Sequence, residues 1–150
     1  MDIYTLTMDD YDAVLALWKV TEGVGVGKAD EPQAIRRYLE RNPGMSFVAR
    51  GADGALLGAV LCGHDGRRGY VHHLAVRPEC RGQGIGRALI DRCLEALAAE
   101  QIDKCHLFVF RNNQVGRAFW EKNGWSERTS LTLYSKDIPL EDTPAGSDIC

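Results

Sequence analysis

Long apolar runs, a leader segment and a basic block are all missing from this sequence. No apolar stretch approaches the ~20 residues that a membrane-spanning helix needs, and the first residues lack the charge and apolar pattern of a signal peptide. The net charge is −3 at pH 7, and nucleic-acid binders need clustered lysine and arginine to displace counterions. We therefore predict a protein with no membrane partner and no nucleic-acid partner.

Cysteine is used without any pattern. There is no CxxC pair and no His/Cys cluster at zinc spacing, and the cysteines lie at positions 62, 80, 93, 105 and 150. An odd, scattered set is typical of free thiols in a reducing compartment. We predict a cytoplasmic protein with no metal site.

The length and composition suit one globular domain. Of the 150 residues, 45% are hydrophobic and 26% are charged, which is enough apolar material for a sizeable core. From residue 137 onward Pro, Glu, Asp, Gly and Ser dominate. We expect a folded domain over residues 1–136 and a flexible C-terminal tail over residues 137–150.

The hydrophobic periodicity predicts elements in the order β-α-α-β-β-β-α-β-α-β. Glycine turns at 53–54 and 65–66 join the three central strands as an antiparallel meander, and the later elements cross over. The fold class is therefore α/β (α+β) with a mixed sheet. The expected elements are strand Ile3–Leu6, a helix capped by Thr7, helix Pro32–Arg41, strands Ser46–Arg50, Leu56–Gly63 and Gly69–Val76, a helix starting at Ile85, strand Cys105–Phe110, helix Asn113–Lys122 and strand Leu131–Tyr134.

The most specific motif is the glycine-rich turn Arg81-Gly82-Gln83-Gly84-Ile85-Gly86-Arg87, between an expected strand and an expected helix. The first turn of a helix offers free N–H groups and the positive end of the helix dipole. Glycines let a phosphate approach that backbone closely. The spacing GxGxG differs from the GxGxxG of dinucleotide folds and from the P-loop. The turn is a candidate phosphate site of another kind.

This turn and its flanks resemble the acetyl-CoA motif of the GNAT acetyltransferases. A second block, Asn113-x-x-Gly-x-x-Phe-Trp-Glu-Lys-Asn-Gly-Trp125, is similar to the family pattern N-x-x-A-x-x-hydrophobic-Y-E-K-x-G-aromatic. The order of elements also fits the family from about residue 3 to residue 135. The resemblance implies a twisted, mostly antiparallel mixed sheet of six to seven strands flanked by helices, and acetyl-CoA as co-substrate.

The resemblance also implies roles for matching residues. The backbone of Leu74–Val76 would hold the pantetheine arm at a splay between two strands, and the amides of Arg81–Gly86 would bind the pyrophosphate. Arg87 would lie beside the pyrophosphate, and Asn113 near the pantetheine. The implied cofactor-binding residues are Leu74, Ala75, Val76, Arg81, Gly82, Gln83, Gly84, Ile85, Gly86, Arg87, Asn113 and Trp120.

Acyl transfer to an amine needs a group that removes a proton and a way for the thiolate to leave. The family often takes an acid from a tyrosine where this chain has Trp120, and an indole N–H is no acid near neutral pH. Tyr134 on the last expected strand is the substitute candidate, beside unassisted departure of the thiolate. Strand alternation places Tyr70 and His72 on one face and His73 on the other. Some family members remove the proton with histidines of this strand, and His72 matches one of them, so His72 is the candidate base, with a water chain as the alternative.

The acceptor is poorly specified. By resemblance it would sit between the loop Thr21–Glu31 and the loop Ser126–Ser130, where Glu22, Asp30 and Glu31 would attract a cationic amine. The leading hypothesis is acetylation of a primary amine of a small molecule or peptide by direct attack. The alternatives are a protein N-terminal or lysine acetyltransferase, and a CoA-binding module whose catalysis is weakened by Trp120. A homodimer is a further possibility, because dimers are common in the family.

Overall fold

The computed structural model describes residues 1–141, so residues 142–150 of the expected tail lie outside the described residues. Its centre is a five-stranded sheet in the order β1-β2-β3-β4-β5. β1 to β4 pair antiparallel, and β5 joins β4 in parallel. The expected mixed and mostly antiparallel sheet is confirmed, but among residues 1–141 it has five strands where six to seven were expected. The strands are β1 Asp2–Thr5, β2 Phe47–Arg50, β3 Leu56–His64, β4 Gly69–Val76 and β5 Cys105–Leu107.

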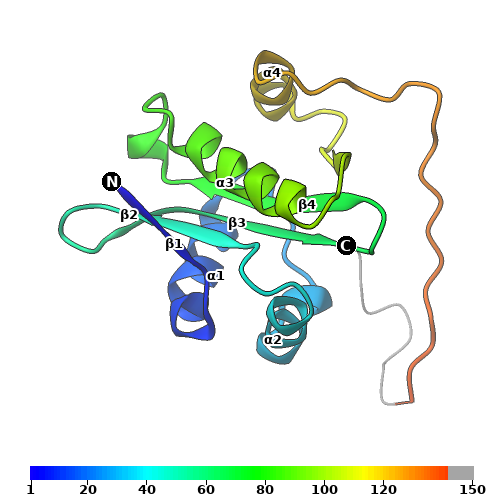
Figure 1. Ribbon diagram of the computed structural model, residues 1–150, viewed down its shortest axis with the longest axis horizontal. Coiled ribbons are helices and arrows are strands. Elements are labelled where there is room, and N and C mark those ends of the chain that lie inside the picture. Colours follow the sequence, from blue (N-terminus) through cyan, green and yellow to red (C-terminus); the bar gives the residue numbers. More distant parts are fainter. Residues whose placement is uncertain (142–150) are drawn as a thin grey trace.

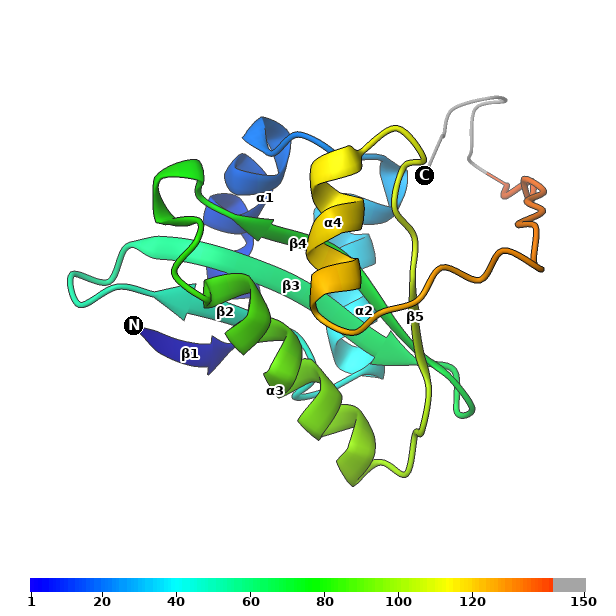
Figure 2. The same cartoon turned by 90° about the horizontal axis from the view of Figure 1, so that it is seen from above.

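Helices cover both faces of this sheet (Figures 1 and 2). α1 (Tyr11–Val20) and α2 (Pro32–Arg41) lie on one face, and α3 (Ile85–Ala99) and α4 (Gln114–Lys122) lie on the other. Each face has its own apolar core, one around α1 and one around α3. The fold is therefore a three-layer arrangement, as the helix and strand order predicted.

Helix α1 begins where local chemistry predicts. The hydroxyl of Thr7 accepts the N–H of Asp9, and the carboxylate of Asp10 accepts the N–H of Thr7 at 2.9 Å. This reciprocal cap starts the short 3₁₀ turn Met8–Asp10, which leads directly into α1. Val14 and Leu17 are then buried against the sheet, which contributes about 1.5–3 kcal/mol for each side chain. Because α1 is anchored in this way, the loop that follows it lies at the edge of β4.

Two expectations about strands are wrong. The strand expected over Cys105–Phe110 ends at Leu107, and Leu131–Tyr134 forms no strand. The alternating apolar residues give that segment strand propensity, but a strand forms only where a neighbouring strand accepts its hydrogen bonds. No strand among residues 1–141 lies beside Leu131–Tyr134.

Strand β4 carries a bulge that sequence periodicity cannot reveal. Ala59 pairs with Ala75 and Leu61 pairs with His72, so Val60 faces the two residues between them. One of these, His73, has a φ of 53°, in the left-handed region that few non-glycine residues adopt. A bulge of this kind re-aims side chains.

Because of the bulge, the side chain of His73 faces a different layer from the one expected. Its ring lies 4.9 Å from the ring of Trp18 on α1, and the ring of His72 lies 6.2 Å from that of Tyr38 on α2. Both histidines therefore face the α1/α2 layer. The prediction that His73 points into the opposite layer is wrong, because it assumed unbroken alternation.

Candidate active site

A cleft of about 1040 Å³ opens where β4 and β5 diverge. The last residues paired between β4 and β5 are Val71 and Leu107, and β4 continues to Val76 without β5. Beyond Val71, β4 therefore has a strand neighbour only on its β3 side, and its other edge faces the cleft. Exposed backbone groups of this kind bind an extended amide-containing chain.

The glycine-rich turn forms one end of the cleft. Gly82 and Gly84 have φ values of 77° and 82°, and a Cβ atom added to either would have no atom within 4 Å. Gly84 is the N-cap of α3 and makes no side-chain cap, so the first-turn N–H groups of α3 stay available to a ligand. Arg81, Arg87 and Lys122 line the same cleft, and their charge adds to the helix dipole. The turn fits a diphosphate.

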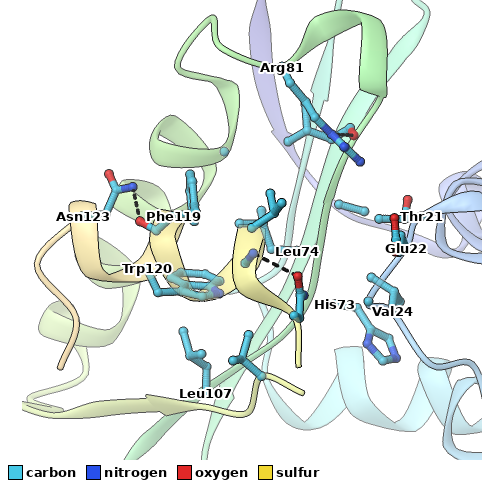
Figure 3. A pocket seen from close by; sticks show the side chains of 18 of the residues that line it. Thr21, Glu22, Val24, His73, Leu74, Arg81, Leu107, Phe119, Trp120 and Asn123 are labelled. Atoms are coloured by element: carbon cyan, nitrogen blue, oxygen red, sulfur yellow. Dashed lines mark hydrogen bonds between the residues drawn. The ribbon is translucent and has the colours of Figure 1, made fainter. Parts of the chain in front are cut away.

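Helix α4 forms a second wall. The side-chain oxygen Oδ1 of Asn113 accepts the N–H of Gly116 at 2.9 Å, which caps the helix. A Cβ atom at Gly23 would lie 2.5 Å from Nδ2 of Asn113, so the loop after α1 closes against the start of α4. Trp120 projects into the cleft (Figure 3) and makes edge-to-face contacts with Phe119 and Trp125, with ring centroids 5.0 and 5.2 Å apart. The wall is aromatic and rigid.

His73 lines the cleft and is hydrogen-bonded to Asp30, which does not line it. Nε2 of His73 lies 2.9 Å from Oδ1 of Asp30, and Asp30 is only 4% exposed. The indole N–H of Trp18 donates to the backbone oxygen of His73 at 3.2 Å. The hydroxyl of Tyr11 donates to the backbone oxygen of Asp30 at 2.6 Å. Figure 3 shows His73 beside Val24 of the loop after α1. Both α1 and the bulge therefore hold this pair in one geometry.

The sequence predicted His72 as the candidate base, whereas His73 is the histidine that lines the cleft. His72 does not line the cleft; it packs among Tyr38, Tyr70 and Phe108. Burial, with a smaller effect of the neighbouring His73, lowers the pKa of His72. Tyr134 is 90% exposed and also lies outside the cleft. The structure thus places neither expected catalytic residue at the cleft.

The structure agrees better with the residues expected to bind the cofactor. All of those that the resemblance implied line the cleft, except Gln83. Of the acidic residues expected near the acceptor, Glu22 lines the cleft, Asp30 is buried against His73, and Glu31 is exposed elsewhere. The loop Ser126–Ser130 contributes nothing to the cleft wall. The cleft is thus basic at the glycine turn, and Glu22 is the carboxylate among its described lining residues.

Neither a metal site nor a membrane span is present among the described residues. Among residues 1–141, no group of three or more His, Cys, Asp or Glu side chains is placed to hold a metal ion. Within the same range, the helices are too short or too polar to cross a bilayer.

Comparison with known proteins agrees with this geometry. Residues 3–125 match the model of the Acetyltransferase (GNAT) family. An acetyltransferase of Pectobacterium atrosepticum is 34% identical over 133 residues, which cover 89% of this chain and 93% of that protein.

Solved structures share the fold. The aminoglycoside 6′-N-acetyltransferase of Acinetobacter haemolyticus superposes with a TM-score of 0.75 at 16% identity, covering 93% of this chain and 100% of that one. The PaiA N-acetyltransferase of Thermoplasma acidophilum, solved with coenzyme A, has a TM-score of 0.71 at 22% identity, covering 98% and 94%.

Proposed function

Because this chain belongs to the acetyltransferase (GNAT) family, we propose that it acetylates the primary amine of a small molecule or peptide by direct attack on acetyl-CoA. The chain is an acyl-CoA-dependent acetyltransferase, like the relatives it matches. The choice of acceptor is our proposal. An aminoglycoside enzyme among the structural neighbours acts on an amine of a small molecule, which supports that choice at the level of fold.

The observation that carries the proposal is the meeting of the splayed strand edge and the glycine turn in one cleft. The pyrophosphate of acetyl-CoA binds at Gly82–Gly86, and the pantetheine runs along Leu74–Val76. This direction brings the thioester toward His73 and the loop Thr21–Gly25. Glu22 on that loop attracts the ammonium form of the acceptor.

His73, rather than His72, is the proton acceptor in this mechanism. Asp30 accepts the hydrogen bond from Nε2–H of His73, because a carboxylate can only accept. Nδ1 then carries the lone pair, and it has no hydrogen-bond partner among residues 1–141. The ammonium form first loses one proton to Nδ1. The amine nitrogen then bonds to the thioester carbon, its second proton passes to water, and the carbon–sulfur bond breaks. The CoA thiolate leaves and takes a proton from water.

The test is binding followed by turnover. Titration calorimetry should show acetyl-CoA binding, with NAD and ATP far weaker. Thiol release should then appear with some members of a panel of small amines, amino acids and peptides, with mass spectrometry identifying the acetylated nitrogen. Acetylation of folded protein termini or lysines alone would favour the protein acetyltransferase alternative. Tight acetyl-CoA binding without release with any amine would favour the weakened binding module, and equal affinity for NAD would contradict the cofactor assignment.

Trp120 has a packing and cofactor-contact role rather than an acidic one, so Trp120→Phe should have a modest effect. The smaller ring loses part of the contact with Trp125, and we expect acetyl-CoA binding to weaken about three- to tenfold, or ~1 kcal/mol. Turnover at saturating acetyl-CoA should fall by less. Titration and steady-state kinetics on the same preparation measure both effects. A loss of turnover near a thousandfold with normal binding would show that the indole takes part in the chemistry.

A further inference from the structure

The cleft has a blind end where β4 and β5 come together. Val71 and Leu107 are the last residues that pair between the two strands, and both line the cleft. Paired strands lie about 4.8 Å apart, with hydrogen bonds across the gap, so no ligand passes between them beyond this pair. The cleft is therefore open along Leu74–Val76 and closed at Val71 and Leu107.

The blind end leaves little room beyond the thioester. In the proposed function, on which this inference rests, the thioester of acetyl-CoA approaches His73. Val71 lies two residues before His73 on β4, and a strand rises about 3.3 Å per residue, so at most about 7 Å of the strand separates them. Only a short acyl group fits between the thioester and the blind end.

Trp120 forms the wall of this space on the α4 side. It lines the cleft and packs against the apolar core around α3, as Leu107 does. Figure 3 shows its indole beside Leu107, whereas the ring of His73 points away from it toward Val24. The ring of His73 contacts Trp18 on α1. The acceptor amine and the indole therefore approach the thioester from opposite sides.

Neighbouring rings fix the indole of Trp120 in place. It makes edge-to-face contacts with Phe119 and Trp125, with ring centroids 5.0 and 5.2 Å apart. A Cβ atom at Gly86 would lie 3.2 Å from Cζ of Phe119, so α4 packs closely on the first turn of α3. Because these contacts would break if the ring moved, Trp120 is a rigid wall that a longer acyl group does not displace.

We propose that Trp120 limits the length of the acyl group that this enzyme transfers. The acetyl group fits between the indole and the blind end, and each further methylene group meets the ring. A tryptophan at the position of the family tyrosine thus supplies bulk rather than an acid, and it determines the donor specificity. Replacing the indole by a small side chain admits longer, unbranched acyl groups such as butyryl.

Titration calorimetry with three ligands tests this role without any acceptor. CoA, acetyl-CoA and butyryl-CoA share the diphosphate and the pantetheine, so differences in their affinity isolate the acyl group. The wild type should bind butyryl-CoA at least about tenfold more weakly than acetyl-CoA, because one surplus methylene in a tight apolar pocket changes recognition about 10–200-fold. Trp120→Ala should bind butyryl-CoA at least as tightly as acetyl-CoA, because the extra methylenes gain apolar contact in the vacated space.

Two further variants complete the experiment. Trp120→Leu keeps an apolar side chain against Leu107, and its ratio of butyryl-CoA to acetyl-CoA affinity should lie between those of the wild type and Trp120→Ala. Alanine and leucine both favour helices, so α4 should survive, and thermal unfolding checks the fold. Phe110→Ala removes a large ring from the same cleft, but beyond the end of β5, and it should keep the wild-type ratio.

The possible results separate this inference from the proposed function. Equal binding of butyryl-CoA and acetyl-CoA by the wild type would overturn the inference, and so would an unchanged ratio in both Trp120 variants. An equally large shift in Phe110→Ala would show that the selection is not made at the blind end. A wild type that binds neither CoA nor acetyl-CoA would overturn the proposed function, and this inference with it.

Discussion

Gly84→Asp should weaken acetyl-CoA binding far more than Gly84→Asn does. Both side chains tolerate the φ of 82° found at this position, and they have nearly the same shape, so only the charge differs. Two like unit charges ~4 Å apart repel each other by ~1 kcal/mol in bulk water and by ~4 kcal/mol near a protein surface. The carboxylate would face the pyrophosphate at that range, so its affinity should fall about ten- to a thousandfold below that of the Asn variant.

Gly54 provides the control for this experiment. It has the same φ of 82°, nothing within 4 Å of an added Cβ atom, and a place in the β2–β3 hairpin outside the cleft. Gly54→Asp should therefore bind acetyl-CoA like the wild type. Titration calorimetry measures the affinities, and thermal unfolding checks that the three variants are folded. If Gly84→Asp and Gly84→Asn bind equally well, the turn does not hold the pyrophosphate.

His73→Asn should lower the acetylation rate by roughly 10²–10⁴-fold, the usual contribution of a general base. Asn adopts the left-handed backbone of the bulge readily, so the fold should survive, and its amide cannot take up a proton. Acetyl-CoA binding should stay within a few-fold of the wild type.

Two further variants separate the roles around this histidine. Asp30→Asn keeps the size of the side chain that holds Nε2 but removes its charge, and it should lower kcat without changing acetyl-CoA affinity. His72→Gln, outside the cleft, should keep a near-normal rate and pH profile. The reverse pattern, with His72→Gln slow and His73→Asn normal, would restore the strand-alternation assignment.

The parts of this protein that sequence determined are those fixed by neighbours along the chain. Helix Pro32–Arg41 and strand Gly69–Val76 have the predicted bounds, because periodicity, capping residues and turn glycines act within a few residues. The glycine turn at 82–86 was recognisable for the same reason: its left-handed backbone and its place at a helix start need particular residues in a row.

Tertiary structure alone decided which histidine reaches the cleft and where the last apolar segment goes. The bulge at His73 arises from the register between β3 and β4, and no sequence pattern near His73 predicts it. Leu131–Tyr134 has strand propensity, but propensity does not supply a neighbouring strand. Both features depend on hydrogen bonds between segments far apart in the chain. A single sequence indicates local conformational preferences, but it does not show which distant backbone groups will pair with each segment.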